Sequence, residues 1–177
     1  YFARAMMYGS VLSGGLAGHV HGTAAYDLTS TGEPAGWRPH VWTALRYDSG
    51  AQMKHLRDFI LSAGGRYQEL QLASADISTR AGANPRDDGL DGWAFMMRTP
   101  GRDLAFVYLE HDAGRPSLRG FVGGARYRWT WFDPRTGHWA LPVELAAAAD
   151  GTLETPPPAF DRDLEMGDWA AQVRLIP

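Results

Sequence analysis

Residues 1–22, YFARAMMYGSVLSGGLAGHVHG, decide the interpretation of the whole chain. Residues 2–13 predict a helix that ends at the glycine pair 14–15, and a strand-like segment, residues 16–22, follows at once. The helix is expected to bury one side, which carries Phe2, Met6, Val11 and Leu12. Because the chain opens inside a helix–strand succession and lacks an initial Met, we expect it to be the C-terminal fragment of a longer protein.

A second helix is predicted from about residue 49, where Asp48 and Ser49 can cap it. Its apolar face carries Met53, Leu56, Phe59 and Ile60. Between the strand and this helix lies a long connection, residues 23–47, of the kind that often holds function. Helix, strand, long loop and helix form the repeating unit of a (β/α)8 barrel, and one unit cannot bury its apolar faces alone. We therefore predict that residues 1–65 are the C-terminal fragment of a (β/α)8 barrel catalytic domain.

The remainder of the chain reads as short strands and turns. Strands are predicted at 67–73, 93–98, 104–110, 125–132, 138–145 and 169–176, and a hairpin turn at 133–137. This pattern predicts that residues 66–177 form a C-terminal antiparallel β-sandwich accessory domain. The fold class is thus α/β plus all-β. Tyr127, Trp129 and Trp131 alternate on one strand face, where they form either a carbohydrate platform or, as we favour, half of a sandwich core.

The composition of the chain argues against some classes of binding partner. The apolar fraction of 45% and charged fraction of 21% are typical of a folded globular chain. A formal net charge of -3 argues against nucleic acid and against an anionic membrane as main partners, and no apolar run approaches a membrane span. The absence of cysteine excludes disulfides and thiol catalysis within these residues.

His19 and His21 are the most suggestive pair for chemistry. They are two residues apart on the predicted strand, so both side chains leave the same face, which in a barrel points into the active-site mouth. Three roles fit: contact with a sugar hydroxyl or a carboxylate, structural histidines bonded to the backbone, or a metal pair. The chain offers no convincing third metal ligand, and we predict neither a metal nor a cofactor.

Two residues of the following loop are further candidates for substrate binding. Tyr26 can stack on a sugar ring or pack the loop onto the barrel, and Asp27 lies close to the strand end. Hydrolysis of a glycoside needs two carboxyl groups roughly 5–9 Å apart. No such pair is evident here, so the catalytic carboxylates are unassigned and expected upstream of residue 1.

Two segments resemble a known family. Residues 12–22, LSGGLAGHVHG, resemble the barrel end of apiosidase-like glycoside hydrolases, and residues 42–57 look like the last barrel helix of that family. Residues 131–137, WFDPRTG, are similar to a signature of the β-sandwich that often follows such barrels, a domain named for collagen binding, and the ending Asp168-Trp169 matches as well. His21 stands where the family usually has Tyr.

The resemblance implies a parent protein that hydrolyses plant or microbial polysaccharide, with a carbohydrate substrate bound through the full-length protein and an extracytoplasmic location, secreted or periplasmic. The fragment alone is then expected to be inactive. The alternative is a non-catalytic β-sandwich module that binds carbohydrate or a surface. Nothing in the sequence supports affinity for collagen.

Overall fold

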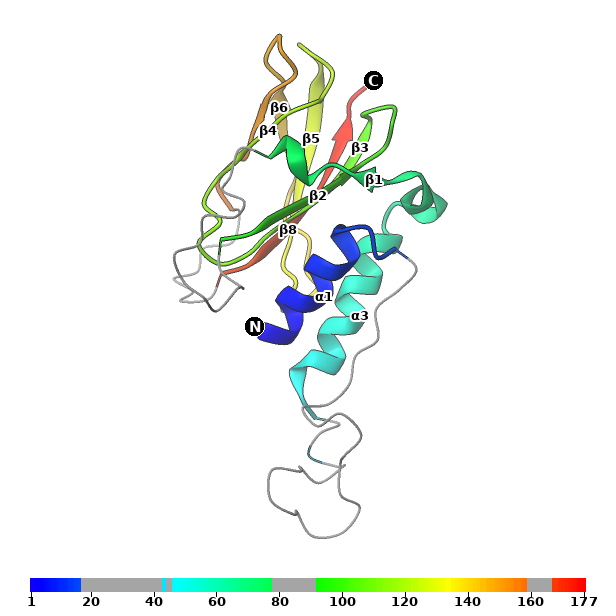
Figure 1. Ribbon diagram of the computed structural model, residues 1–177, viewed down its shortest axis with the longest axis vertical. Coiled ribbons are helices and arrows are strands. Elements are labelled where there is room, and N and C mark those ends of the chain that lie inside the picture. Colours follow the sequence, from blue (N-terminus) through cyan, green and yellow to red (C-terminus); the bar gives the residue numbers. More distant parts are fainter. Residues whose placement is uncertain (17–42, 44–45, 78–91, 159–166) are drawn as a thin grey trace.

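The computed structural model describes residues 1–16, 43, 46–77, 92–158 and 167–177. These residues form three layers: a helix pair, a six-stranded sheet and a two-stranded sheet (Figure 1). The helix pair consists of α1 (Phe2–Leu12) and α3 (Asp48–Leu61). The short 3-10 helices η1 (Gly64–Glu69) and η2 (Ser74–Asp76) lead from the helix pair into the sheets.

Every strand pair in the described residues is antiparallel. The large sheet has the spatial order β1 (Gln71–Leu72), β2 (Ala94–Arg98), β3 (Leu104–Leu109), β8 (Trp169–Leu175), β5 (Arg126–Phe132) and β6 (Val143–Ala146). The small sheet pairs β4 (Ser117–Leu118) with β7 (Leu153–Glu154). The expectation of a largely antiparallel β structure with few helices is confirmed. Its division into a barrel end and a separate sandwich stays a prediction.

Strand β3 shows why the large sheet holds the molecule together. It is buried along its whole length. Because side chains alternate between the two faces of a strand, Val107 joins the core under the small sheet, whereas Phe106 joins the core under the helices. Both faces of the sheet are therefore covered, and the strand reads as a continuous apolar run rather than as an alternating one.

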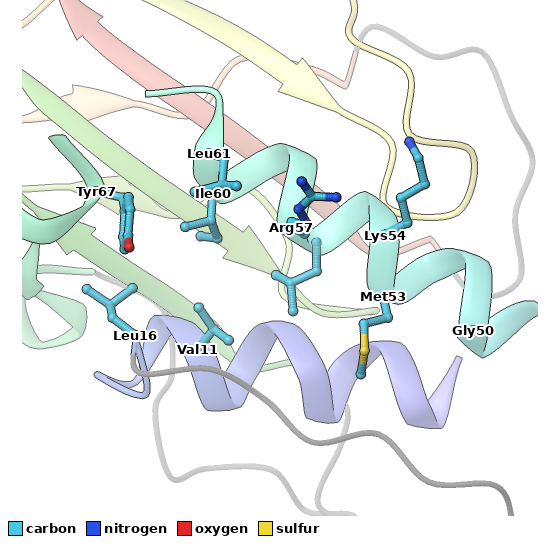
Figure 2. Close-up of a pocket in the computed structure, with 10 residues that line it drawn as sticks. Val11, Leu16, Gly50, Met53, Lys54, Arg57, Ile60, Leu61 and Tyr67 are labelled. Carbon is cyan, nitrogen blue, oxygen red and sulfur yellow. The ribbon is translucent and has the colours of Figure 1, made fainter. Parts of the chain in front are cut away.

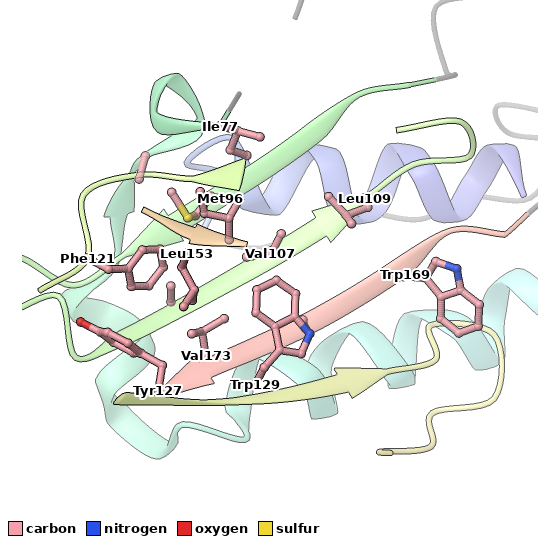
Figure 3. Close-up of a cluster of buried hydrophobic side chains, with 14 of the residues drawn as sticks. Ile77, Met96, Val107, Leu109, Phe121, Tyr127, Trp129, Leu153, Trp169 and Val173 are labelled. Atoms are coloured by element: carbon pink, nitrogen blue, oxygen red, sulfur yellow. The ribbon is translucent and has the colours of Figure 1, made fainter. Parts of the chain in front are cut away.

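The first core lies between the two sheets (Figure 3). Tyr127, Trp129 and Trp131 of β5 are each at most 1% exposed, and Leu118 and Leu153 close this core from the small sheet. The prediction that the aromatic row belongs to the core is confirmed. Its burial removes the row as an exposed platform for a sugar.

The second core lies between the other face of the sheet and the helix pair. Tyr8 of α1 stacks on Tyr108 of β3 with ring centroids 4.8 Å apart. Phe59 of α3 lies edge-on to Phe106 at 4.7 Å and also contacts Phe132 at 5.2 Å. Such pairs contribute about 0.5–1.5 kcal/mol each beyond their buried area. The two predicted segments, 1–65 and 66–177, thus share a core across their boundary.

The turn between β5 and β6 forms as its sequence predicts. Gly137 has a φ of 75°, in the left-handed region, and its N–H donates to the carbonyl of Asp133 at 2.8 Å. A bridge between Phe132 and Trp139 and the β5–β6 ladder continue the hairpin beyond the turn. This turn carries the tip of the hairpin to α3, where a Cβ on Gly137 would lie 2.4 Å from Nδ1 of His55.

The strand predicted at residues 67–73 is wrong for most of its length. Residues 64–69 form η1 instead, and only Gln71–Leu72 belongs to a strand. Gly64 opens η1 with a φ of 60°, and Arg66 forms an ion pair with Glu69 at the i,i+3 spacing that a 3-10 turn brings together. Sequence reasoning also missed β4 and β7, because two-residue strands are too short to show an alternating pattern.

Candidate functional site

The predicted substrate-binding residues His19, His21, Tyr26 and Asp27 lie outside the described residues. The structure instead describes what flanks that segment: α1 and Leu16 on one side, and α3 on the other. The candidate site is therefore characterised by the helix pair and by the way the sheet holds it.

Helices α1 and α3 lie side by side and run in the same direction (Figure 1). Their C-terminal ends are close together, because Leu16, Leu61 and Tyr67 line one hollow. Two consecutive helices can be parallel only if the chain between them returns along their length. The connection from α1 to α3 therefore begins at one end of the helix pair and finishes at the other.

A groove of about 490 Å³ runs between the two helices (Figure 2). Its floor is formed by Val11, Leu56 and Ile60, which are at most 8% exposed. Apolar groups of intermediate exposure line its sides, and Lys54 and Arg57 of α3 also contribute to its lining. The groove is thus apolar inside, with two basic side chains from one helix.

A second hollow, of about 330 Å³, lies along α1 where it faces the start of β2. The rings of Trp93 and Phe95 stack there with centroids 6.5 Å apart, and Phe95 approaches α1 closely enough that a Cβ on Gly9 would lie 3.3 Å from the ring. Met6 also lines this hollow and is 48% exposed, so the prediction that Met6 faces the core is wrong. The cause is that β2 approaches α1 at Gly9, which leaves Met6 beside the contact.

A buried ion pair fastens α1 to the last strand. Arg4 is 4% exposed and Asp168 is fully buried. Nε of Arg4 donates to both carboxylate oxygens of Asp168, at 2.8 and 3.1 Å, and its terminal nitrogen donates to Oδ1 at 2.6 Å. The hydroxyl of Tyr108 donates a further hydrogen bond to Oδ2 at 2.8 Å. The carboxylate is thus held from α1 and from β3 at once.

The protonation states in this network follow from its burial. Burial works against the charge on Arg4, but the hydrogen bonds to Asp168 outweigh it and raise the pKa of the guanidinium. Burial, together with the negative charge of Asp168, raises the pKa of the Tyr108 hydroxyl well above its ordinary value. Arg4 therefore stays charged and Tyr108 stays a hydrogen-bond donor.

A second polar group fixes the hairpin turn beside this network. Asp133 accepts hydrogen bonds from the backbone N–H of Arg135 at 2.9 Å and from its Nε at 2.7 Å. Burial opposes ionisation of Asp133, but these bonds lower the pKa of the carboxyl overall. The guanidinium of Arg135 lies 4.4 Å above the ring of Trp169, the neighbour of Asp168 in β8. The turn is therefore fastened to the same strand end as α1.

Sequence reasoning missed the roles of Arg4 and Asp168. Asp168 belongs to the C-terminal segment that carries the family resemblance and Arg4 to the first predicted helix, yet neither was assigned a contact. The available signal was a charged residue within or next to an apolar stretch, Arg4 inside the first helix and Asp168 just before β8, which predicts a buried pair but does not identify the partner.

Within the described ranges, no group of three or more His, Asp or Glu side chains is arranged to hold a metal ion. No helix in that part of the chain is long and apolar enough to cross a membrane.

Comparison with known proteins adds a fold relationship. No protein-family model matches the sequence, and no curated protein matches it. A glycoside hydrolase family 5 protein from Bacteroides vulgatus superposes with a TM-score of 0.66 at 20% identity, covering 97% of this chain and 35% of its own. A second protein, described as a glycoside hydrolase, gives a TM-score of 0.65 at 20% identity, with 97% and 36% covered. The chain therefore has a fold that also occurs in glycoside hydrolases, and it spans about a third of those chains.

Proposed function

We propose that residues 1–177 are the C-terminal part of a glycoside hydrolase that acts on plant or microbial polysaccharide. In this proposal residues 1–65 supply the last helix–strand–helix unit of the catalytic barrel, and residues 66–177 are an accessory sandwich that braces it. The catalytic carboxylates lie upstream of residue 1. The parallel arrangement of α1 and α3 on one face of the sheet is the observation that carries the proposal.

The length of the predicted strand supports a barrel unit. Helix α3, with 14 residues, is about 21 Å long. A return strand of seven residues, as predicted for 16–22, spans about 23 Å. One strand is therefore long enough to bring the chain back along the helix pair. The other residues of the connection would form a loop at the N-terminal end of α3. In a barrel that loop lies at the active-site face.

The structural comparisons support the same proposal. The match covers 97% of this chain, so it includes both the helix pair and the sheets in one arrangement. We further propose the apiosidase-like assignment, which rests on the resemblance of residues 12–22 and 131–137 and goes beyond the comparison with family 5. No feature of the described residues favours collagen as a ligand.

Activity measurements on two proteins test the proposal. The full-length product of the gene should release sugar from at least one member of a polysaccharide panel, whereas residues 1–177 alone should release none. Hydrolysis by residues 1–177 would contradict the placement of the carboxylates upstream. A full-length product of only about 177 residues would be too short to contain the barrel and would reject the proposed reaction.

His19 and His21 are the residues proposed to contact the sugar, with Tyr26 and Asp27 beside them. Replacing His19 or His21 by Ala in the full-length enzyme should lower kcat/KM about tenfold or more. A His55→Ala variant is the matched control, because His55 lies on α3 and packs against the hairpin turn. Kinetics unchanged by either histidine substitution would reject the assignment.

Glycan binding without catalysis is the second candidate, and the hollow beside Trp93 and Phe95 favours it, because stacked aromatic rings line a concave surface there. Calorimetric titration of residues 1–177 with the same panel, and of a Trp93→Ala variant, tests this role. Binding that Trp93→Ala abolishes would support a glycan-binding module. Absence of binding across the panel would leave bracing of the barrel as the role of the sandwich.

A further inference from the structure

The face of the large sheet that carries the helix pair also has a part that the helices do not cover. Residues 127, 129 and 131 of β5 point into the core between the two sheets, so Arg126, Arg128 and Thr130 point to the opposite face. Helix α3 covers Phe132 at one end of this face, whereas Arg126 and Arg128 at the other end are exposed. Strands β5 and β8 thus extend beyond the helix pair (Figure 1).

A row of charged side chains crosses this uncovered part of the sheet. Arg128 of β5 lies directly opposite Arg174 of β8 on one side and directly opposite Glu144 of β6 on the other. Side chains that are directly opposite have Cβ atoms about 4.5–5.5 Å apart. Glu144 forms an ion pair with Arg126, which precedes Arg128 by two residues on the same face. These four residues, Arg126, Arg128, Glu144 and Arg174, form the charged row, in which three of the four charges are positive.

Two arginines of the charged row lack a carboxylate partner. Arg174 donates hydrogen bonds only to uncharged oxygens, Oε1 of Gln172 at 2.5 Å and the backbone carbonyl of Ser62 at 3.1 Å. Among the residues that the structure describes, Arg128 has neither an ion pair nor a side-chain hydrogen bond. Like charges that lie directly opposite each other destabilise a sheet. An anion between Arg128 and Arg174 would remove this repulsion.

We propose that the charged row binds an acidic glycan, with a uronate carboxylate held between Arg128 and Arg174. A guanidinium is a planar fork of donors that matches a carboxylate, and two forks on neighbouring strands can bind the two oxygens of one group. A hollow of about 280 Å³ adjoins Arg174 and is also lined by Leu175 and Pro177. This hollow offers room for the sugar ring that carries the carboxylate.

The surroundings of the row favour a glycan over other anions. The formal net charge of the chain is -3, so the row is not part of a broad basic field of the kind that binds nucleic acid. Protein partners are held mainly by buried aromatic and apolar anchors, whereas the row is charged and its neighbour Thr130 is polar. The hydroxyl of Thr130 and the carboxylate of Glu144 can form hydrogen bonds with sugar hydroxyls.

The charged row is a different site from the hollow beside Trp93. That hollow lies at the start of β2, near the row that joins Leu109 to Trp169, whereas Arg174 lies opposite Leu104 at the other end of the same strand pair. Five residues of strand separate the two ends, which is about 17 Å. The proposal therefore goes beyond the proposed function and does not depend on it.

Calorimetric titration of the full-length protein, and of residues 1–177 in parallel, tests the proposal with oligogalacturonates and oligoalginates as probes. At least one of these uronate probes should bind. Methyl-esterified oligogalacturonates keep the sugar but lose the charge, so they should bind at least about tenfold more weakly than the free acids if galacturonate is the ligand. Polyglutamate of the same charge should also bind more weakly. Binding of neither uronate probe, or equal affinity for polyglutamate, would overturn the proposal.

Substitutions locate the binding. Arg128→Ala should lower the affinity for the uronate probe about tenfold or more, and Arg128→Lys, which keeps the charge without the fork, should restore part of it. Arg119→Ala is the matched control, because Arg119 is an exposed arginine beside the small sheet that donates to the backbone carbonyl of Ala75. It should leave the affinity unchanged. The Tm of Arg128→Ala should not fall, since a like-charge pair is removed. Equal affinities of the Arg128→Ala and Arg119→Ala variants would overturn the assignment.

The outcomes separate the charged row from the proposed function. Uronate binding that depends on Arg128, in a full-length protein that hydrolyses no polysaccharide, would retain the row as a site and reject the hydrolase. Hydrolysis without any effect of Arg128 on binding would do the reverse. Binding by residues 1–177 that the full-length protein lacks would assign the row to a contact within the parent protein and overturn the proposal.

Discussion

The buried pair of Arg4 and Asp168 leads to the sharpest prediction about stability. Arg4→Met keeps a long apolar stem on α1 but removes all three hydrogen bonds to the carboxylate. Asp168 would then stay fully buried, and within the described residues the Tyr108 hydroxyl would be its remaining side-chain hydrogen-bond donor. Breaking a buried ion pair by removing one partner costs about 3–5 kcal/mol, because it leaves an uncompensated charge. We expect a loss in this range, a large share of the stability of a typical domain.

The measurement is equilibrium unfolding of residues 1–177 in urea at pH 7. Arg126→Met is the matched control, since Arg126 pairs with Glu144 at the surface, where the two side chains are 65% and 46% exposed. Exposed pairs contribute at most about 1 kcal/mol. The difference between the two arginine substitutions therefore isolates the effect of burial.

A double-mutant cycle completes the test. Arg4→Met and Asp168→Asn combined should cost about 2 kcal/mol less than the sum of the two single losses, because the second change removes the charge that the first leaves unpaired. Additive losses, or an Arg4→Met loss no greater than that of Arg126→Met, would refute the view that this pair fastens the helix to the sheet.

Three further predictions use the same unfolding assay. Gly137→Ala should lower the free energy of unfolding by about 1–2 kcal/mol, because residue 137 has a left-handed backbone conformation and the new Cβ would lie 2.4 Å from His55. Adding His55→Ala should recover part of this loss. Trp129→Ala should cost about 3–5 kcal/mol, whereas Leu141→Ala, at an 87% exposed position, should stay within about 0.5 kcal/mol; equal effects would contradict the core assignment. Hydrogen bonds from Arg66, and to a lesser degree from Thr99, lower the pKa of Asp103 from 3.8 to about 2. The ionised carboxylate therefore stabilises the folded state above pH 4, and this stabilisation is lost as the pH falls through 2. Both partners of the Arg66–Asp103 pair are about a third or more exposed, so the free energies of unfolding of wild type and Asp103→Asn should differ by less than about 1 kcal/mol. This difference should disappear between pH 4 and pH 2. A difference that does not depend on pH would reject the pair.

Local sequence patterns predicted several of the regular elements, because those patterns reflect local physics. The helix predicted at 2–13 is α1, and the hairpin turn at 133–137 forms around Gly137. The aromatic row from Tyr127 to Trp131 was assigned to the core because a sandwich needs large apolar anchors, and its burial confirms this. Each of these predictions depended on a spacing or a turn residue within about ten positions.

Features that depend on distant residues could not be predicted in the same way. Arg4 and Asp168 are 164 positions apart, and no periodicity links them. The exposure of Met6 depends on the approach of Phe95 to Gly9, which only the packing of β2 against α1 determines. The predicted sugar contacts at His19 and His21 stay predictions, since they lie outside the described residues.

The shared second core bears on how residues 66–177 should be studied. In residues 66–177 alone, Phe106, Tyr108 and Phe132 would lose the helices that cover them. Each buried aromatic side chain removes about 150–250 Å² from water, so exposing three at about 25 cal/mol per Å² costs roughly 11–19 kcal/mol as an upper bound. That cost is comparable to the whole stability of a typical domain. Binding measured on residues 66–177 alone would therefore report on an uncovered apolar face, whereas residues 1–177 keep that face covered by the helix pair.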